Sequence, residues 1–187
     1  SFRNEEGNIK ELVERINKSL NILKDWSYEI IFVNDDSTDN SETILLDLQK
    51  SNPIKIINMS RNFGVDPCVI AGFRHAKGDA IVYLHTDLQD PPEIIPKLIK
   101  KFEEGNDVVH TVRSKRHGES KFRLFVTKIA YHIINIISDI DLPIEAGDYK
   151  LISRKALDKI LMQKEFRPYV RGLSVWVGFK QSFVKYV

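Results

Sequence analysis

Three oxygen-bearing side chains lie close together directly after an apolar segment. Asp87, Gln89 and Asp90 follow residues 80–84, an apolar run typical of a buried strand. Carboxylate and amide oxygens suit Mg²⁺ or Mn²⁺, which proteins commonly hold with one or two carboxylates while substrate phosphates fill other positions. A metal held in this way offsets the charge on a leaving diphosphate. In the alternative, Asp90 caps a helix that begins at Pro91, but capping explains neither Asp87 nor Gln89.

A second acidic group lies in the loop that follows an earlier apolar run. Asp35, Asp36 and Asp39 crowd the polar segment 34–41. Their like charges repel one another unless a cation or a ligand rich in hydrogen-bond donors compensates them. A nucleotide base or ribose supplies such donors. An ordinary polar loop explains the same cluster equally well, because Asp, Ser, Thr and Asn are common turn residues.

Two basic groups offer sites for an anion. Residues 61–64, Arg-Asn-Phe-Gly, follow an apolar run and would place a guanidinium and a helix N-terminus near a phosphate. The second group comprises Arg113, Lys115, Arg116, Lys121 and Arg123, with Glu119 as the acid nearby. Solvated surface is its ordinary meaning, and a site for an anionic acceptor is the alternative.

Composition and missing motifs exclude several functions. The formal net charge of +2 is too small to indicate nucleic-acid binding, so no nucleic acid is expected as a partner. The five histidines show no zinc-ligand spacing, and the motifs of NTPases, dinucleotide-binding folds and serine hydrolases do not occur. The single cysteine, Cys68, cannot form an intrachain disulfide, which favours a reducing, cytoplasmic setting.

The elements that must position these residues alternate between helix and strand. Apolar residues at helical spacing predict a first helix over 9–23. Further strands are predicted at 28–33, 54–59, 80–84 and 107–112, and further helices around 44–48, 66–76 and 92–104. This alternation predicts an α/β fold with a Rossmann-like, mainly parallel sheet flanked by helices. Because such sheets bind ligands beyond the carboxyl ends of their strands, the loops after Val33, Met59 and Leu84 should converge on one crevice.

The length of 187 residues fits a single domain with a substantial core. No run of about 18 apolar residues occurs, so no membrane-spanning segment is expected. Residues 121–137 form a helical candidate with apolar and basic side chains. That helix would pack on the core or, in the alternative, make peripheral contact with a membrane interface.

The ordered set of segments resembles glycosyltransferase family 2, the inverting enzymes of the GT-A fold. Within the family, the resemblance is to polyprenyl-phosphate sugar transferases such as dolichyl-phosphate mannose synthase and bacterial undecaprenyl-phosphate glucosyltransferases. Residues 1–5 resemble the family's Pro-x-Tyr-Asn-Glu, and residues 33–39 its Val-Asp-Asp-Gly-Ser-Thr-Asp. Residues 61–64 match directly, and Asp87-Leu88-Gln89-Asp90-Pro91 is similar to Asp-x-Asp-Leu-Gln-Asp-Pro.

The resemblance continues toward the end of the chain, so it covers nearly all of it. Residues 147–154, Gly-Asp-Tyr-Lys-Leu-Ile-Ser-Arg, resemble Gly-Asp-Phe-Arg-Leu-Met-Ser-Arg. Residues 171–173 and 176–178 resemble Arg-Gly-Leu followed by Trp-x-Gly. Single segments of this kind are weak signals, but their order and spacing are highly specific.

The resemblance implies a role for each matching residue. The implied donor-binding residues are Ser1, Arg3, Glu5, Asp35, Ser37, Arg61, Gly64, Asp87 and Gln89. The implied metal ligands are Asp87 and Gln89, the implied catalytic residues are Asp87, Asp148 and Arg171, and the implied ligands of an acceptor phosphate are Arg113 and Lys121.

The implied reaction is inverting transfer of a sugar from a nucleotide-sugar donor, with a UDP-sugar favoured, to a polyprenyl phosphate at the inner, cytoplasmic face of a membrane. Mg²⁺ or Mn²⁺ and Arg171 would stabilise the departing diphosphate. A phosphate acceptor needs no base, so Asp148 would position; with a glycan hydroxyl as acceptor, Asp148 becomes the candidate base. A catalytically silent nucleotide-binding domain is the third alternative.

Some positions depart from the family pattern. His85 stands where the first Asp of Asp-x-Asp is expected, while Asn34, Asp36 and Lys150 replace the family's Asp, Gly and Arg. His85 and Asp87 point to the same face if the strand continues. His85 would therefore either orient a metal ligand or act as an imperfect ligand itself.

The family pattern also extends beyond both ends of the chain. A strand is expected before Ser1, and an Arg-rich segment with transmembrane helices is expected after Val187. The chain is therefore expected to be a trimmed catalytic domain, with residues 1–112 binding the nucleotide sugar and residues 113–187 forming a smaller acceptor-side region.

Overall fold

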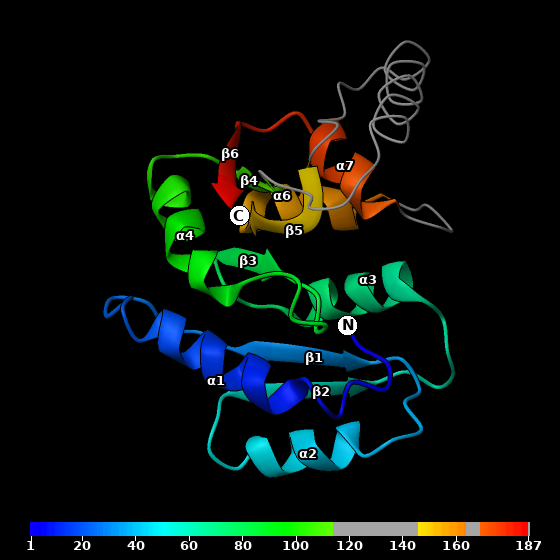
Figure 1. Ribbon diagram of the computed structural model, residues 1–187. Coiled ribbons are helices and arrows are strands. Elements are labelled where there is room, and N and C mark those ends of the chain that lie inside the picture. The colour runs from blue at the N-terminus through cyan, green and yellow to red at the C-terminus, as the bar shows by residue number, and fades with distance from the viewer. Residues whose placement is uncertain (114–145, 164–168, 187) are drawn as a thin grey trace, which may run out of the picture.

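The computed structural model describes residues 1–113, 146–163 and 169–186, in which helices and strands alternate (Figure 1). The elements in chain order are α1 (Ile9–Leu20), β1 (Ile30–Asn34), α2 (Ser41–Leu48), β2 (Ile54–Asn58), α3 (Val65–His75), β3 (Ala80–Tyr83), the 3-10 helix η1 (Pro92–Ile94), α4 (Ile95–Glu103), β4 (Val108–Arg113), β5 (Ala146–Ser153), α6 (Arg154–Leu161), α7 (Val170–Trp176) and β6 (Gln181–Tyr186). The predicted alternation is confirmed, with boundaries shifted by a few residues. The helix predicted at 121–137 lies outside the described residues.

The described strands form two sheets. β1 pairs in parallel with β2, and the second sheet has the order β3-β5-β4-β6. In that sheet β4 and β6 are parallel, while β5 runs antiparallel to both β3 and β4. The α/β class with parallel-rich sheets is confirmed, but neither β5 nor its reversed direction was predicted. Because β5 is reversed, the residues that precede Lys150, the partner of Tyr83, lie beyond the carboxyl end of β3.

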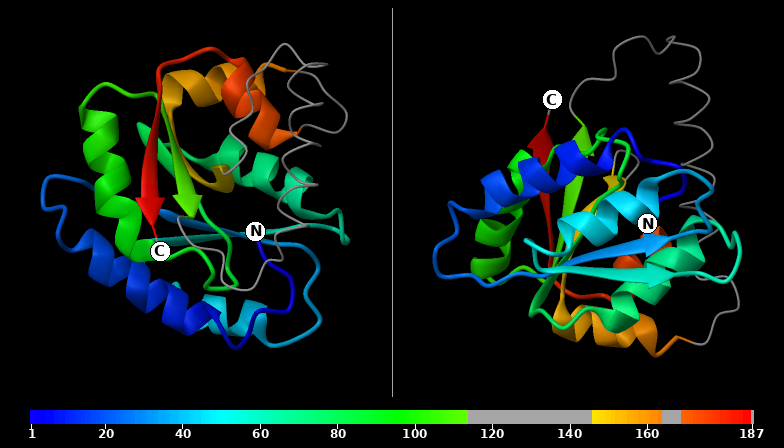
Figure 2. Two further views of the ribbon diagram at one scale, coloured as in Figure 1. Left: turned by 45° about the horizontal axis from the view of Figure 1, so that its top comes forward. Right: turned by 90° about the horizontal axis from the view of Figure 1, so that it is seen from below.

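Helices cover the strands from two sides (Figure 2). α1 contacts α4 on one side, and α3 contacts α6 on the other. Leu12 of α1 and Leu45 of α2 are buried in a cluster with Phe32 of β1. Leu98 of α4 is buried in another cluster with Leu151 of β5. This burial on both sides holds the strands in place and thereby positions the loops at their carboxyl ends.

The first helix shows how the sequence pattern builds an element. Ile9, Leu12, Val13 and Ile16 recur at helical spacing and are buried. Burial of one apolar stripe, rather than helix propensity, is the main source of stability for a helix of this length. The apolar pattern continues to Leu23, but the helix ends at Leu20. Within the part of the chain that the structure describes, no helix has the length and apolar character needed to cross a bilayer.

Candidate active site

The carboxyl end of β3 leads into a tight loop that carries Asp87. Leu88 has a φ of 60°, which is left-handed backbone, and Asp87 Oδ1 accepts a hydrogen bond from the backbone N–H of Gln89 at 3.1 Å. Asp90 is buried, and its Oδ2 accepts from the backbone N–H of His85 at 3.0 Å. Asp90 therefore closes the turn. The alternative in which it caps the following helix is wrong, because η1 begins at Pro92 without a side-chain cap.

A cluster of three residues that are distant in sequence lies next to this loop. Arg171 Nε and Nη2 donate to the two carboxylate oxygens of Asp148 at 3.0 and 2.8 Å. His85 Nε2 lies 3.8 Å from Asp148 Oδ2. The reversed direction of β5 places Asp148 beside His85, and the first turn of α7 supplies Arg171. Nothing in the local sequence pattern predicted that these three residues would meet.

The charges in this cluster shift two pKa values in opposite directions. His85 lowers the pKa of Asp148 most strongly; burial opposes this effect, and Arg171 adds to it. The interaction with Asp148 raises the pKa of His85 against the effect of burial, and the charges of Asp90 and Asp87 act in the same direction as Asp148. Asp148 is therefore an ionised partner of cationic groups and not a carboxyl group poised to take up a proton.

Lys150 lies on the same strand as Asp148, two residues further on, and has no exposed surface. Its Nζ donates to Ser174 Oγ at 3.1 Å, and Ser174 Oγ donates to the backbone oxygen of Arg171 at 2.8 Å. Burial lowers the pKa of Lys150 to about 8; Asp148 opposes this effect, and Arg171 adds to it. This chain of contacts ties β5 to the first turn of α7, from which the Arg171 side chain extends. The sequence indicated Lys150 only as a departure from the family pattern.

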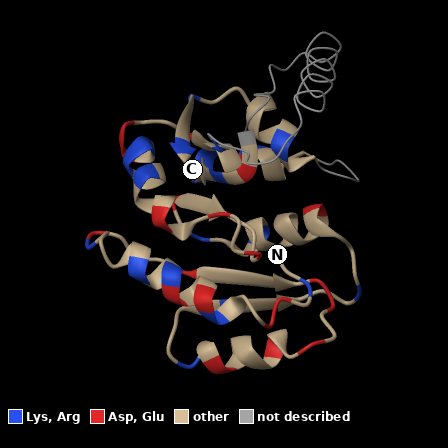
Figure 3. Ribbon diagram, viewed as in Figure 1, with Lys and Arg blue, Asp and Glu red and all other residues tan. Residues whose placement is uncertain are grey.

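A pocket of about 160 Å³ adjoins the Asp87 loop. It brings together predicted donor-binding residues from the N-terminal segment and from the loops after β1, β2 and β3, namely Ser1, Arg3, Glu5, Asp35, Gly64 and Asp87. His85 also lines it, whereas Ser37, Arg61 and Gln89 do not. Figure 3 shows the acidic residues of the loops that follow β1 and β3. The loops converge on one crevice as predicted.

Asp35 holds two of these loops together. Its side chain is buried, with Oδ1 accepting from Phe63 N at 2.7 Å and Oδ2 from Gly64 N at 2.9 Å. Gly64 has a φ of 89°, a conformation that glycine adopts most readily. Asp35 therefore fixes the backbone at the start of α3, while a contact with the nucleotide stays a prediction. Arg61 lies over the ring of Phe63, with Cζ 3.9 Å from the ring centroid.

Asp35→Asn is expected to lower the free energy of unfolding by about 2 kcal/mol, because an amide replaces a carboxylate that accepts two backbone hydrogen bonds. Urea denaturation followed by circular dichroism measures this change. Asp36→Asn is the matched control, since Asp36 is exposed in the same loop. Equal stability of the two variants would contradict the structural role of Asp35.

His110 lies on β4 opposite Lys150 of β5 and is fully buried. Its Nε2 is 2.8 Å from Gln181 Oε1, and its Nδ1 has no hydrogen-bond partner in the described structure. Burial, and next the charge of Lys150, lower the pKa of His110 to about 4, while Gln181 acts in the opposite direction. The ring is therefore neutral in the folded protein at neutral pH.

This shift predicts a loss of stability in acid. Between the ordinary histidine pKa of about 6.5 and the folded value, the unfolded chain binds a proton that the folded chain does not, so the free energy of unfolding falls as the pH falls. The contribution of His110 is about 3 kcal/mol over this interval. Denaturation at pH 7 and pH 4 should show a smaller loss for His110→Gln than for wild type. His75→Gln, at an exposed position, should retain the wild-type loss.

Arg113, a predicted ligand of an acceptor phosphate, borders the Asp87 loop. It is exposed at the end of β4, and its Nη2 donates to the backbone oxygen of Gln89 at 3.2 Å. Its guanidinium carbon lies 5.9 Å from the ring centroid of Tyr186. The guanidinium therefore lies next to the turn that carries Asp87. Lys121, the other predicted ligand, lies outside the described residues.

The predicted metal ligands, Asp87 and Gln89, would fill only part of the coordination shell of a metal ion. Asp87 and Gln89 are exposed, and one Asp87 oxygen already accepts from the backbone. Among the described residues, no three His, Cys, Asp or Glu side chains are grouped to hold a metal ion. One carboxylate and one amide oxygen fit Mg²⁺ or Mn²⁺ only where phosphate oxygens and water complete the coordination. This donor set therefore fits a metal that shares its ligands with a diphosphate, and not a closed protein cage.

Comparison with known proteins places these residues in a wider context. The sequence model of the family "Glycosyl transferase family 2" matches residues 1–161. The chain is 45% identical over 185 residues to YkcC of Bacillus subtilis, an uncharacterized glycosyltransferase, covering 98% of this chain and 57% of that protein. It is 38% identical over 166 residues to the prophage bactoprenol glucosyl transferase homolog of Escherichia coli, covering 88% of this chain and 54% of that protein. The chain thus spans about half the length of these relatives.

A solved structure shares the fold. The mannosyltransferase PcManGT of Pyrobaculum calidifontis, in complex with GDP-Man and Mn²⁺, superposes with a TM-score of 0.63. The match covers 98% of this chain and 52% of that one, at 15% sequence identity. At this level of identity the likeness shows the fold alone.

Proposed function

Since this chain belongs to glycosyltransferase family 2 and has the GT-A fold, we propose that it catalyses inverting transfer of a sugar from a nucleotide sugar to a polyprenyl phosphate. The resemblance to the bactoprenol glucosyl transferase homolog supports a lipid phosphate as acceptor. A lipid acceptor implies work at the inner, cytoplasmic face of a membrane. We propose a UDP-sugar as donor on the resemblance to bacterial members of this branch.

Our choice of acceptor rests on the contact between Asp148 and Arg171. A glycan hydroxyl must lose a proton when it attacks, and Asp148 is the candidate base for that step. Its two oxygens instead accept from Arg171, and His85 and Arg171 lower its pKa. A phosphate acceptor is already an anion and needs no base. The pairing therefore favours polyprenyl phosphate over a glycan hydroxyl.

The proposed reaction breaks one bond and forms one at the anomeric carbon. An oxygen of the acceptor phosphate attacks, the bond to the donor diphosphate breaks, and the configuration inverts. Arg171, held in place by Asp148, would stabilise the charge on the leaving diphosphate. Arg113 and Lys121 would bind the acceptor phosphate. Mg²⁺ or Mn²⁺ on Asp87 and Gln89 would supply Lewis-acid stabilisation of the leaving group.

In our proposal, one part of the chain binds the donor and the other part forms the acceptor side. Residues 1–112 would bind the nucleotide sugar through the pocket beside Asp87. Residues 113–187 would form the acceptor side and also contribute Asp148 and Arg171 to the reacting centre. His85 would act as an orienting residue rather than a metal ligand, because its ring lies toward Asp148.

Turnover of the full-length protein in detergent with UDP-glucose and undecaprenyl phosphate tests this proposal. Arg113→Ala is expected to raise the KM for the lipid phosphate roughly ten-fold or more, because a charge-assisted contact is worth about 1.5–3 kcal/mol. Spontaneous hydrolysis of the donor should change little. Lys185→Ala, at an exposed cation on neighbouring β6, is the matched control. Turnover with a glycan acceptor alone would contradict the proposal.

A further inference from the structure

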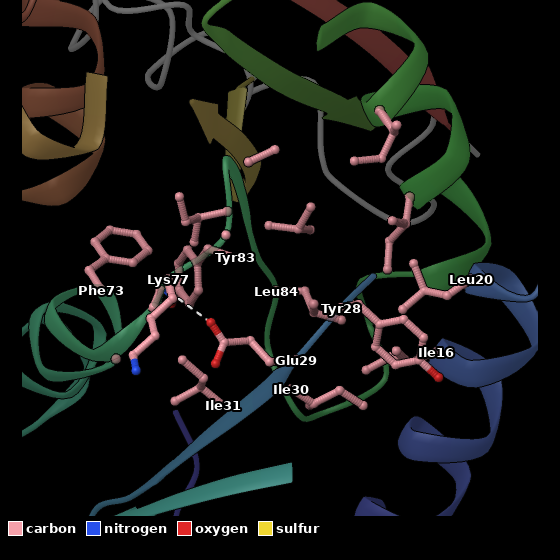
Figure 4. A pocket seen from close by; sticks show the side chains of 18 of the residues that line it. Ile16, Leu20, Tyr28, Glu29, Ile30, Ile31, Phe73, Lys77, Tyr83 and Leu84 are labelled. Atoms are coloured by element: carbon pink, nitrogen blue, oxygen red, sulfur yellow. Dashed lines mark hydrogen bonds between the residues drawn. The ribbon is translucent and has the colours of Figure 1, made fainter. Parts of the chain in front are cut away.

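Lys150 lies on an inner strand of the second sheet, in surroundings that offer an ammonium group few polar contacts. On β5 it stands between its strand partners Tyr83 of β3 and His110 of β4, and it has no exposed surface. The ring of Tyr83 stands edge-on to that of Phe73, with the centroids 6.2 Å apart. Both rings line an apolar cavity of about 460 Å³ (Figure 4). Because lysine is almost never fully buried unless it is paired, the contacts of this ammonium group matter.

The hydrogen bonds of Lys150 lead to α7. In the described part of the chain, its Nζ donates to a hydroxyl group, Ser174 Oγ at 3.1 Å, and not to a carboxylate. Ser174 has no exposed surface either, and its Oγ donates to the backbone oxygen of Arg171 at 2.8 Å. A hydroxyl group has a single proton, so Ser174 must accept from Lys150. The two bonds therefore run in one direction, from the ammonium group through the hydroxyl group to the main chain of Arg171.

Arg171 is thus held at two points, and both contacts come from β5. Asp148 accepts from its guanidinium at 3.0 and 2.8 Å, while Ser174, bound by Lys150, donates to its main chain. Asp148 and Lys150 are two residues apart on β5, and side chains at this spacing point to the same face of a strand. One strand therefore positions both the side chain and the backbone of Arg171.

α7 depends on such contacts because it is short. It has seven residues, and a helix of this length is unstable without tertiary contacts. Besides the bond from Lys150 to Ser174, Gln181 Nε2 of β6 donates to the backbone oxygen of Val175 at 3.2 Å. Two strands thus bind neighbouring residues of the helix through buried or half-buried polar groups. Loss of either contact would loosen the element that carries Arg171.

We propose that Lys150 is a positioning residue of the transfer reaction, which acts through Ser174 to hold the main chain of Arg171. This inference rests on the proposed function, in which the guanidinium of Arg171 faces the leaving diphosphate. Stabilisation of a developing charge depends on donors that are held in place, and a small displacement of the main chain reduces it. Loss of the contact should therefore lower kcat, while the KM for the lipid phosphate, which Arg113 would bind, should change little.

Lys150→Met is the main test, because methionine fills a similar volume without a charge. Replacement of a buried charge by an apolar side chain of similar size is often neutral or stabilising, so the midpoint of thermal unfolding should stay or rise. With UDP-glucose and undecaprenyl phosphate, kcat of the full-length protein should nevertheless fall roughly ten-fold. The KM for the lipid should change less than about two-fold. Wild-type kcat in the folded variant would overturn the proposal.

Ser153→Ala is the matched control on the same strand. Ser153 is buried, and its Oγ donates to Asp107 Oδ1 at 3.0 Å and accepts from Ala156 N at 3.3 Å as the cap of α6. Its loss should lower the unfolding midpoint by roughly 2 °C or more and leave kcat unchanged. The two variants should thus show opposite patterns. A fall in kcat that follows stability in both variants would make Lys150 a merely structural residue and refute the proposal.

Hydrogen exchange of the full-length protein, followed by mass spectrometry, tests the contact without substrate. Amides of residues 173–177 should exchange roughly ten-fold faster in Lys150→Met and in Ser174→Ala, whereas those of α4 should not change. Lys150→Arg, which keeps a charged donor, should retain slow exchange and most of kcat. Unchanged exchange of 173–177 in both variants would overturn the inference. If the wild type transferred no sugar to the lipid phosphate, the proposed function would fail, and this experiment would still decide whether Lys150 holds Arg171.

Discussion

Asp87→Ala is expected to lower kcat for sugar transfer roughly 1,000-fold, which makes it one of the two most damaging single changes. Asp87 is the single carboxylate that the loop after β3 exposes on the pocket that we propose for the donor. Its partner in the proposed set of metal ligands is an amide, Gln89. In the proposed site, removal of Asp87 would leave Mg²⁺ or Mn²⁺ without a charged protein ligand, and the leaving diphosphate without the charge compensation that the metal would supply.

Steady-state transfer assays across a titration of Mn²⁺ measure this effect. Chelation of the metal should reduce the wild-type rate to about the level of the variant, whereas it should change the rate of the variant little. Asp47→Ala, at an exposed carboxylate on α2, is the matched control and should keep wild-type activity. Because the open site needs phosphate ligands, calorimetry should also show that Mn²⁺ binds more tightly when UDP is present. Full activity of Asp87→Ala would refute the proposed metal site.

Arg171→Ala is expected to lower kcat roughly 100- to 1,000-fold, since it removes a charge that would face the leaving diphosphate. Asp148→Asn is expected to cost less, roughly ten- to 100-fold, because the guanidinium remains but loses its two carboxylate contacts. If Asp148 acts through Arg171, the double variant should be no slower than Arg171→Ala. Double-mutant cycles on kcat measure this coupling.

The same variants distinguish positioning from proton transfer. A base role for Asp148 predicts that Asp148→Asn is slower than Arg171→Ala and that the acid limb of the pH–rate profile disappears. A positioning role predicts that the profile keeps its shape while kcat falls. Arg171→Lys, which keeps the charge but not the two-pronged contact, should recover part of the rate.

The pattern of residues predicted well which loops converge on one pocket, for a local reason. Apolar runs and the polar loops after them can be read directly from the sequence. Because parallel strands end at the same edge of a sheet, the loops that carry Asp35, Gly64 and Asp87 had to converge. The pocket confirms that they do. The individual contacts were less predictable: Asp35 binds backbone N–H groups, and Asp90 closes its own loop.

The sequence by itself determined the α/β class, the first four strands and the family, because periodicity and motifs are local properties of the chain. Only the tertiary structure decided that Asp148 pairs with Arg171 beside His85 and that buried Lys150 donates to Ser174 on the helix that carries Arg171. These contacts depend on the reversed direction of β5 and on which strands it joins. A strand has the same two-residue repeat whichever way it runs, so its direction is settled by distant packing.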